Sequence, residues 1–348
     1  MSPHIALAPS TSRWLFRGKD GRLTAYALAD GGILRWTESV PGGPEWTGPD
    51  FLATPDLLHV SFGQGPDGYV HLLARRRRAQ GGDDLMHAVQ YQSGRPIGPW
   101  QSLGNPHTKD MNKARAVGVP GVAVSADGYV HLFLNNGNGA VNLRRQTKAV
   151  KWQGWQDLKG ANFREGMAAA VAVGGLVEAL APADKELLRR EQDAPGGDFT
   201  EAEPVAATPY PGSIEGLQTA ESRATYYWSD RENPGIVAHR PGSDPIPLGG
   251  DPDSGPPAVL RTPIEGHDCT VLAYRSRSGR PAIAACPTEG EADGLWWTPT
   301  GEPSLGAPAL ALDAEDRVVM AAIAEDGTLR IARQKAEPGL ALAAWAKV

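Results

Sequence analysis

Two stretches of the chain, GPDGYVHLLAR (residues 65–75) and SADGYVHLFLN (residues 125–135), are copies of one another and decide the fold class. Each has an Asp-Gly pair followed by Tyr-Val-His-Leu, in which apolar and polar residues alternate. Asp-Gly beside alternating apolar residues is a strong signal for a β-hairpin, because its tight turn needs residues that accept positive φ. The two stretches therefore predict two equivalent hairpins in a duplicated unit.

Fainter copies of this turn recur along the whole chain. Five of the six intervals between successive turns are 46 to 48 residues and one is 60. The seven turns are Asp20-Gly21, Asp67-Gly68, Asp127-Gly128, Gly174-Gly175, Glu221-Ser222, His267-Asp268 and Glu315-Asp316. Such a period is typical of β-propeller blades, each a four-stranded sheet with its turns. We predict an all-β, seven-bladed β-propeller of four-stranded antiparallel blades. It forms one domain over residues 1–348, with approximate blades 1–56, 57–114, 115–164, 165–211, 212–255, 256–304 and 305–348.

The long interval contains two insertions, at residues 75–84 and 105–115. In a four-stranded meander, the connections that hold them emerge on the same face. Extra loops on one face of a repeat fold usually line the binding face. A tolerated surface insertion is the equally favoured alternative.

The charge and composition of the chain restrict the classes of molecule that it is expected to bind. The formal net charge is -6 and the isoelectric point is about 5.8, so the chain lacks the basic field that nucleic acids and anionic membranes attract. No stretch approaches the ~18 apolar residues of a membrane span. No signal peptide is recognised at the N-terminus, which predicts a cytoplasmic protein or one exported by a route without such a signal. We expect no nucleic-acid or membrane partner, and the oligomeric state is not predicted.

The third unit, GVPGVAVSADGYVHLFLNNGNGAVNLRRQTKAVKWQGWQDLKG (residues 118–160), resembles a blade of the seven-bladed propeller lectins of the bacterial fucose-binding type. It is similar, more loosely, to tectonin-like repeats. The resemblance covers all seven units in layout and the first three in their letters. It implies sugar binding in shallow pockets between neighbouring blades, with a Trp of the third strand as the stacking platform.

Carried over by position, the resemblance places this Trp at Trp36 in the first unit and at Trp296, beside Trp297, in the sixth. These three residues are the predicted ligand-binding residues. The other units hold Met86, Asn142, Leu188, Ala238 and Arg330 at the same position. For the remaining repeated Trp residues we favour packing between blades; these are Trp46, Trp100, Trp152 and Trp155.

Motifs for familiar catalytic chemistry are absent from the sequence. There is no HExxH, Cys-x-x-Cys, P-loop, dinucleotide fingerprint or Gly-x-Ser-x-Gly, so we expect no metal and no cofactor. One enzymatic alternative uses polar residues expected at the mouth of the propeller channel: His59, His107, Glu215 and Arg261. Together they could act as general acid and base on a small organic substrate.

The two cysteines flank a predicted turn in the sixth unit. If that turn is symmetric, Cys269 and Cys286 lie opposite each other at a separation that a disulfide can span. A one-residue shift of the register removes this pairing. Reduced thiols are the alternative that we favour for a chain without an export signal.

These observations favour a non-catalytic, lectin-like propeller that binds a carbohydrate or another small polar ligand. The cofactor-independent enzyme is the first alternative. A scaffold that binds other proteins through its faces is the second.

Overall fold

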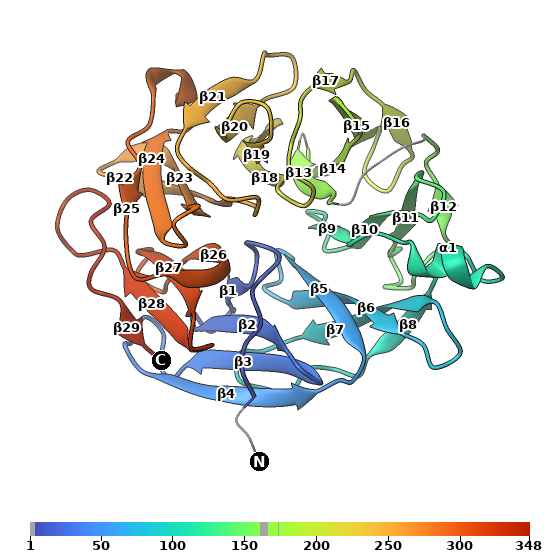
Figure 1. Cartoon of the computed structure of the whole chain (residues 1–348), viewed down its shortest axis with the longest axis horizontal. Coiled ribbons are helices and arrows are strands. Elements are labelled where there is room, and N and C mark those ends of the chain that lie inside the picture. The colour runs from blue at the N-terminus through green and yellow to red at the C-terminus, as the bar shows by residue number, and fades with distance from the viewer. Residues whose placement is uncertain (1–3, 161–165, 173) are drawn as a thin grey trace. The chain divides into compact units, whose positions relative to one another are not determined.

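The computed structural model describes residues 4–160, 166–172 and 174–348, which form seven antiparallel sheets and two short helical segments (Figure 1). The seven sheets are the blades of a β-propeller, which confirms the predicted fold class. The chain divides into two compact units, residues 1–55, 92–94 and 225–348 in the first and residues 56–91 and 95–224 in the second. No helix in the described ranges is long and apolar enough to cross a membrane.

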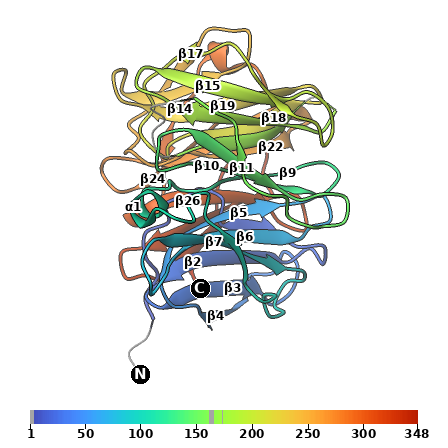
Figure 2. The ribbon, with the colours of Figure 1, turned by 90° about the vertical axis from the view of Figure 1, so that its right-hand side faces the viewer.

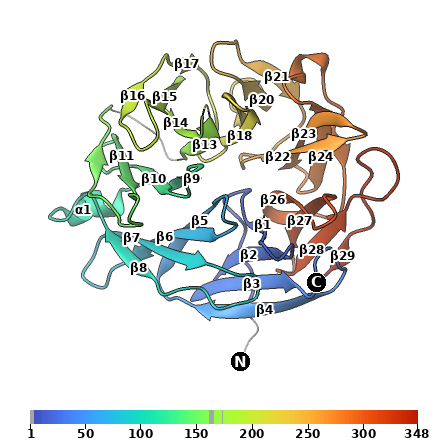
Figure 3. The same ribbon diagram turned by 180° about the vertical axis from the view of Figure 1, so that it is seen from behind.

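The first unit contains three complete sheets, in which consecutive strands pair. The strands are β1 (Leu15–Arg17), β2 (Leu23–Ala29), β3 (Gly32–Glu38) and β4 (Trp46–Ala53) in the first sheet; β22 (Ala258–Ile264), β23 (His267–Arg275), β24 (Pro281–Pro287) and β25 (Thr298–Pro299) in the sixth; and β26 (Ser304–Leu312), β27 (Val318–Ala324), β28 (Leu329–Arg333) and β29 (Ala346–Lys347) in the seventh. A 3-10 turn, η1 (Glu291–Asp293), lies between β24 and β25. Figure 3 shows the C-terminus beside β29.

The second unit also contains three complete sheets. Their strands are β5 (Leu57–Gln64), β6 (Val70–Arg77), β7 (Asp83–Gln90) and β8 (Gln101–Gly104); β9 (Gly121–Val124), β10 (Val130–Asn135), β11 (Val141–Arg145) and β12 (Gln156–Asp157); and β13 (Ala168–Ala172), β14 (Leu176–Pro182), β15 (Glu186–Gln192), β16 (Phe199–Glu201) and β17 (Val205–Ala206). Both β16 and β17 pair with β15, and Pro204 between them has no N–H to continue the ladder. The fifth sheet has the order β18 (Glu215–Ala220), β19 (Arg223–Asp230), β20 (Gly235–His239) and β21 (Ile246–Gly249).

The hydrophobic cores lie between neighbouring sheets. In the second unit, Leu73 and Leu85 of the second sheet pack in one cluster with Val130 and Leu132 of the third. Figure 2 shows β5, β6 and β7 side by side in this unit. All six residues of β10 are buried, because neighbouring sheets cover both of its faces. This burial explains why such strands are rich in apolar residues rather than strictly alternating.

The turns of the two duplicated hairpins lie where the sequence predicts them, but the turn of the sixth sheet lies elsewhere. Gly68 and Gly128 adopt φ of 76° and 82°, as the Asp-Gly signal predicts. In the sixth sheet the turn is Glu265-Gly266, with φ of 51° and 80°, whereas His267-Asp268 was predicted. His267 and Asp268 instead begin β23. The prediction was wrong by two residues because it followed the repeat spacing rather than the residue that tolerates positive φ.

The two insertions of the second unit contact each other. The first extends β6 and β7, and the second contains α1 (Met111–Arg115), which Asp110 caps by accepting from the N–H groups of Asn112 and Lys113. Asn105 joins the two insertions, because its side-chain amide donates to Asp83 O at 2.8 Å and to Ala114 O at 3.0 Å. This contact agrees with the prediction that both connections emerge on one face.

The symmetric turn on which a cysteine pairing depends is not formed, in agreement with the reduced thiols that were favoured. In the β23–β24 register, Cys269 lies opposite Pro287 and Cys286 lies opposite Thr270, one residue away from the symmetric arrangement. Successive strand residues point to opposite faces, so the two side chains are directed apart. Both cysteines are free and buried. Burial also raises the pKa of the Cys286 thiol, to about 12, which makes it a poor nucleophile.

Candidate functional site

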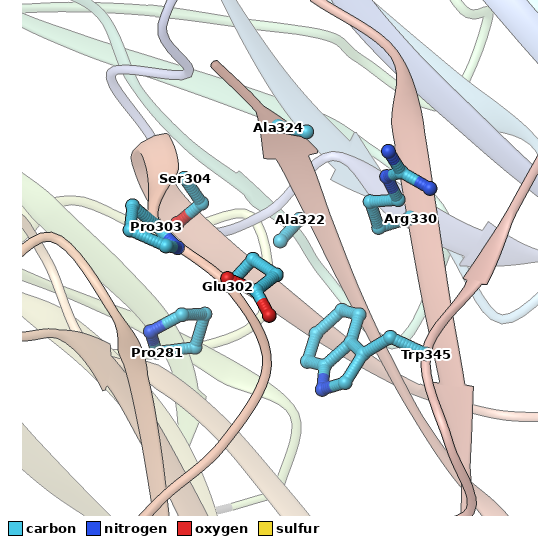
Figure 4. A pocket seen from close by; sticks show the side chains of 8 residues that line it. All are labelled: Pro281, Glu302, Pro303, Ser304, Ala322, Ala324, Arg330 and Trp345. Carbon is cyan, nitrogen blue, oxygen red and sulfur yellow. The ribbon is translucent and has the colours of Figure 1, made fainter. Parts of the chain in front are cut away.

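A hollow of about 140 Å³ lies between the sixth and seventh sheets of the first unit. Its lining is Pro281, Glu302, Pro303, Ser304, Ala322, Ala324, Arg330 and Trp345. Figure 4 shows the Trp345 indole, the Glu302 carboxylate and the Arg330 guanidinium around Ala322. The hollow therefore combines a small apolar floor with one aromatic ring and two charged groups.

The shape of this hollow, here called the Trp345 pocket, follows from residue size and strand periodicity. Ala322 and Ala324 are two apart on β27, so both methyl groups face the same side and leave room above the strand. The indole is fixed at its polar edge, because Trp345 Nε1 donates to Thr300 Oγ1 at 3.0 Å. Gly301 lies against this edge with φ of 67°, and a Cβ there would come within 2.8 Å of Nε1. Glycine thus allows the close approach that holds the ring.

The two charged groups of the Trp345 pocket are weakly engaged by the protein. Glu302 is exposed and makes no hydrogen bond or ion pair with any residue that the structure describes. Arg330 lies 3.7 Å from Asp326, which also accepts from Thr328 Oγ1 at 2.5 Å and from Lys347 Nζ at 3.2 Å. The Thr328 hydrogen bonds lower the pKa of Asp326 to about 2, so this carboxylate is ionised and already satisfied. Arg330 and Glu302 are therefore available to a ligand.

The predicted aromatic residues occupy three different environments. Trp36 in β3 is only 2% exposed, which leaves no free ring face. Trp297 donates from Nε1 to Leu248 O at 2.9 Å, and its ring centroid lies 4.6 Å from that of Tyr274. Trp296 is 91% exposed. Of the three, Trp296 alone presents an open indole, and it does not line the Trp345 pocket.

Two of the other repeated tryptophans join neighbouring sheets, as predicted. Trp152 and Trp155 pack against the core cluster shared by the second and third sheets. The ring of Trp152 meets His87 of β7 edge to face, with centroids 5.1 Å apart. The guanidinium of Arg144 lies 5.6 Å from the centroid of Trp155. These indoles serve packing rather than an open site.

The four channel-mouth candidates each have a defined place. His59 in β5 is buried, which lowers its pKa to about 4, and its Nε2 donates to Ser61 Oγ at 3.0 Å. His107 Nε2 accepts from the N–H of Gly137 at 3.0 Å. Glu215 begins β18 and is buried. Their shared catalytic role remains a prediction.

Arg261 in β22 belongs to the first unit and is bound to one carboxylate. Its guanidinium makes a bidentate pair with Asp268, with N–O distances from 2.6 to 3.0 Å. These hydrogen bonds raise the pKa of Arg261 further above its ordinary range. Within the described residues, no group of three or more His, Cys, Asp or Glu side chains is placed to hold a metal ion.

Sequence reasoning missed Trp345 and Glu302 and named Arg330 only as the residue at the stacking position of the seventh unit. A signal for Trp345 was present. Trp345 directly precedes the outermost strand β29, as Trp155 precedes β12 and Trp297 precedes β25. Glu302 had no such signal, because it lies in the connection between two sheets, outside the repeated strand pattern.

No protein-family model matches the chain, and no curated protein matches its sequence. Among solved structures, BP39L lectin from Burkholderia pseudomallei is similar with a TM-score of 0.71 and 15% identity, covering 98% of this chain and 100% of the lectin. The Aleuria aurantia lectin gives 0.52 at 12% identity, covering 84% and 97%. An ulvan lyase, a polysaccharide lyase, gives 0.57 at 9% identity, covering 95% and 93%. The chain therefore has the propeller fold that these lectins share with a polysaccharide-cleaving enzyme, and at these identities the likeness shows the fold alone.

Proposed function

We propose that this chain is a carbohydrate-binding propeller and that the Trp345 pocket holds one monosaccharide unit. The observation that carries the proposal is the indole beside an alanine floor, with the exposed Glu302 and the weakly paired Arg330 at its rim. A sugar ring has a flat C–H face that matches an indole, and hydroxyl groups that need donors and acceptors. Arg330 supplies N–H donors, and the Glu302 carboxylate supplies acceptors.

The size of the pocket supports a single ring. A protein cavity of ~150 Å³ is known to accommodate one benzene molecule, whereas pockets for drug-sized ligands measure ~300–1,000 Å³. At about 140 Å³, the Trp345 pocket has room for one six-membered ring, with the rest of a glycan in solvent. The Aleuria aurantia lectin, which shares the fold, was solved with a fucosylated N-acetylglucosamine bound. Lectins among the structural neighbours thus agree with a sugar ligand.

The test is a titration of neutral monosaccharides, including L-fucose, followed by isothermal calorimetry and ligand-observed NMR. Glu302→Gln removes the acceptor charge from an exposed side chain and leaves the fold intact. Trp345→Ala removes the stacking surface. We expect each variant to weaken binding by about tenfold, which corresponds to ~1.4 kcal/mol.

Trp296→Ala is the matched control, because it removes an indole from the same unit outside the pocket. It should leave sugar affinity unchanged, and thermal unfolding checks that Trp345→Ala is folded. The proposal fails if no neutral sugar binds the wild-type chain, or if Trp296→Ala abolishes binding while Glu302→Gln and Trp345→Ala retain it.

A further inference from the structure

Two arginines hold the same structural position in the third and seventh sheets. Arg145 ends β11, and Arg333 ends β28. The guanidinium of Arg333 donates to Gly43 O at 2.7 Å, and that of Arg145 donates to Gly197 O. Gly43 and Gly197 are themselves equivalent, because the N–H of each donates to the carbonyl oxygen three residues earlier. The two arginines therefore bridge to the following sheet in the same way.

The turn beside each arginine is also equivalent. The N–H of Ser125 donates to Tyr129 O at 3.0 Å, and the N–H of Asp313 donates to Arg317 O at 3.0 Å. Ser125 in the third sheet thus corresponds to Asp313 in the seventh, and Tyr129 corresponds to Arg317. One carboxylate and one guanidinium of the seventh sheet are replaced by neutral side chains in the third.

The sheets that follow the two arginines also differ by one carboxylate. Glu38 Oε2 accepts from the N–H of Leu23 at 2.8 Å, and Gln192 Oε1 accepts from the N–H of Val177 at 3.3 Å. Glu38 and Gln192 therefore hold the same position at the end of the third strand of their sheets. Beside Arg145, that position carries an uncharged amide.

Around Arg333, both of the carboxylates that are missing around Arg145 are present. Arg333 lies 2.6 Å from Glu38 and 3.0 Å from Asp313, and both carboxylates are fully buried. Arg317 also pairs with Asp313, at 2.9 Å. The two buried carboxylates are thus balanced by two partly exposed guanidinium groups.

Arg145 lacks this balance. It is buried, and the one carboxylate within ion-pair distance among the described residues is that of Asp198, at 3.8 Å and 77% exposed. A buried guanidinium is costly unless a carboxylate and good hydrogen bonds compensate it. An exposed partner at this distance compensates it poorly.

A cavity of about 270 Å³ occupies the place of the missing carboxylates. Its lining includes Ser125, Gln192 and Arg145 themselves. Gln153 also lines it, and its Oε1 accepts from Arg145 Nε at 3.0 Å. The charged lining groups are Arg145 and Lys148 against the exposed Asp127, so the cavity has an excess of positive charge. It is called the Arg145 pocket below.

Two buried side chains in the Arg145 pocket have a polar atom without a protein partner among the described residues. Gln146 is 6% exposed, and its Oε1 accepts from the N–H of Val130, while its amide nitrogen has no acceptor. The equivalent amide nitrogen of Gln334 donates to Gly339 O at 2.6 Å. His131 is 2% exposed, and its Nδ1 donates to Tyr129 O at 3.0 Å, which leaves Nε2 as a free acceptor. Donors and an acceptor thus line a pocket whose buried guanidinium has neutral hydrogen-bond acceptors, Gln153 Oε1 and Gly197 O, but no buried counter-charge among the described residues.

We propose that the Arg145 pocket is a second binding site, for a carboxylate-bearing sugar of the sugar-acid class. The planar guanidinium of Arg145 takes the carboxylate, as Arg333 takes Glu38 and Asp313. The hydroxyl groups of the sugar meet the Gln146 amide, His131 Nε2 and Thr147. This site shares no lining residue with the Trp345 pocket and does not depend on the function proposed for it.

The test compares sodium D-glucuronate with D-glucose and inorganic phosphate by calorimetry on the full chain. The decisive variant, Ser125→Asp with Gln192→Glu, restores the carboxylates found around Arg333. Glu at position 192 can still accept from Val177 N–H, as Glu38 accepts from Leu23, so the fold is retained and thermal stability should not fall. We expect glucuronate to bind at least about tenfold more tightly than glucose or phosphate, and the double variant to lose this preference.

Gln334→Glu is the control, because it makes the same amide-to-carboxylate exchange in the seventh sheet, outside the pocket. It should leave glucuronate affinity unchanged. Equal binding of glucuronate and glucose, equal binding of phosphate, or unchanged binding by the double variant would each overturn the proposal. The Trp345→Ala variant should bind glucuronate normally, so failure of this site and failure of the neutral-sugar site are distinguishable.

Discussion

The arginines of this chain pair with carboxylates at similar distances but in different surroundings. Arg333 meets the fully buried Glu38 and Asp313, whereas Arg261 meets the half-exposed Asp268. Removing Arg333 leaves the buried Glu38 without a counter-charge and leaves Asp313 with Arg317 alone, and breaking a buried pair in this way costs about 3–5 kcal/mol. We therefore expect Arg333→Met to lower the free energy of unfolding by this amount in urea titrations.

Arg261→Met is the matched control for this prediction. Its partner can be hydrated when the guanidinium is removed, so the expected loss is ~1 kcal/mol or less. Equal losses for the two variants would show that burial around Arg333 does not set its contribution.

Buried histidines of the second unit should make stability depend on pH. Burial lowers the pKa of His71 to about 4 and that of His87 to about 3, and in His87 the neighbouring His71 adds to the effect. His71 Nδ1 and His87 Nε2 lie 3.1 Å apart. Since both pKa values are below the usual 6.5, the unfolded chain binds more protons between these limits. Stability is therefore complete above pH 6.5 and is lost as the pH falls toward 4 and then 3.

The measurement is the free energy of unfolding in urea at several pH values from 7.5 to 4.5. Each such histidine contributes a slope of up to about 1.4 kcal/mol per pH unit within the window. His87→Gln removes one titrating group, so its profile should be flatter than that of the wild-type chain. Parallel profiles would contradict the assignment of this slope to His87.

At the residue scale, sequence predicted the type of side chain in the candidate site better than its position. The indole as a stacking surface was inferred from the lectin-like units, but Trp36 is only 2% exposed. Exposure of an indole depends on the size of the residues facing it, here Ala322 and Ala324 beside Trp345. Those residues come from another strand, so the sequence near the Trp does not carry this information.

At the scale of single elements, a glycine in the turn of the sixth sheet allows the effect of backbone conformation on stability to be measured apart from the effect of packing. Gly266 has φ of 80° in a tight turn, and Gly154 has no positive φ; a Cβ at either position meets open space. Left-handed backbone costs an L-residue ~1–2 kcal/mol. We expect Gly266→Ala to reduce the free energy of unfolding by this amount.

Gly154→Ala should be neutral or stabilising by up to ~1 kcal/mol, because it only restricts the unfolded chain. Thermal and urea unfolding of the two variants check the pair. A stable Gly266→Ala protein would imply that the turn lies at His267-Asp268 after all.

The same hairpin shows how far sequence determines an element. The chain reversal between β23 and β24 was predicted from the residues around the two cysteines, and the pairing order of β22, β23 and β24 follows from short connections. The register was not recognisable, because it depends on the residue at which each chain reversal closes. A shift of one residue between β23 and β24 was enough to separate Cys269 from Cys286.

At the scale of the whole molecule, the repeat keeps its internal hydrogen bonds and varies the residues between sheets. A glutamine near the end of the third strand accepts from the second strand's backbone in the third, fourth and seventh sheets, at Gln146, Gln192 and Gln334. The residues beside it differ, from the balanced charges around Arg333 to the open pocket around Arg145. Sequence periodicity reveals the constant part, whereas both proposed binding sites lie in the variable part, where no repeat can indicate them.

The hydrogen bond from the second strand's backbone N–H to this glutamine should therefore contribute to the free energy of unfolding in every sheet that has it. Gln334→Met keeps the side-chain volume but leaves the buried N–H of Val318 without its acceptor, which costs about 1–3 kcal/mol. Gln192→Met should cost a similar amount at Val177. Gln218→Met is the control, because that exposed side chain donates to Glu221 O in contact with water and should change the free energy of unfolding by less than ~0.5 kcal/mol. Urea titrations measure all three, and a loss at Gln334 no larger than at Gln218 would mean that the repeat retains this glutamine for a reason other than backbone satisfaction.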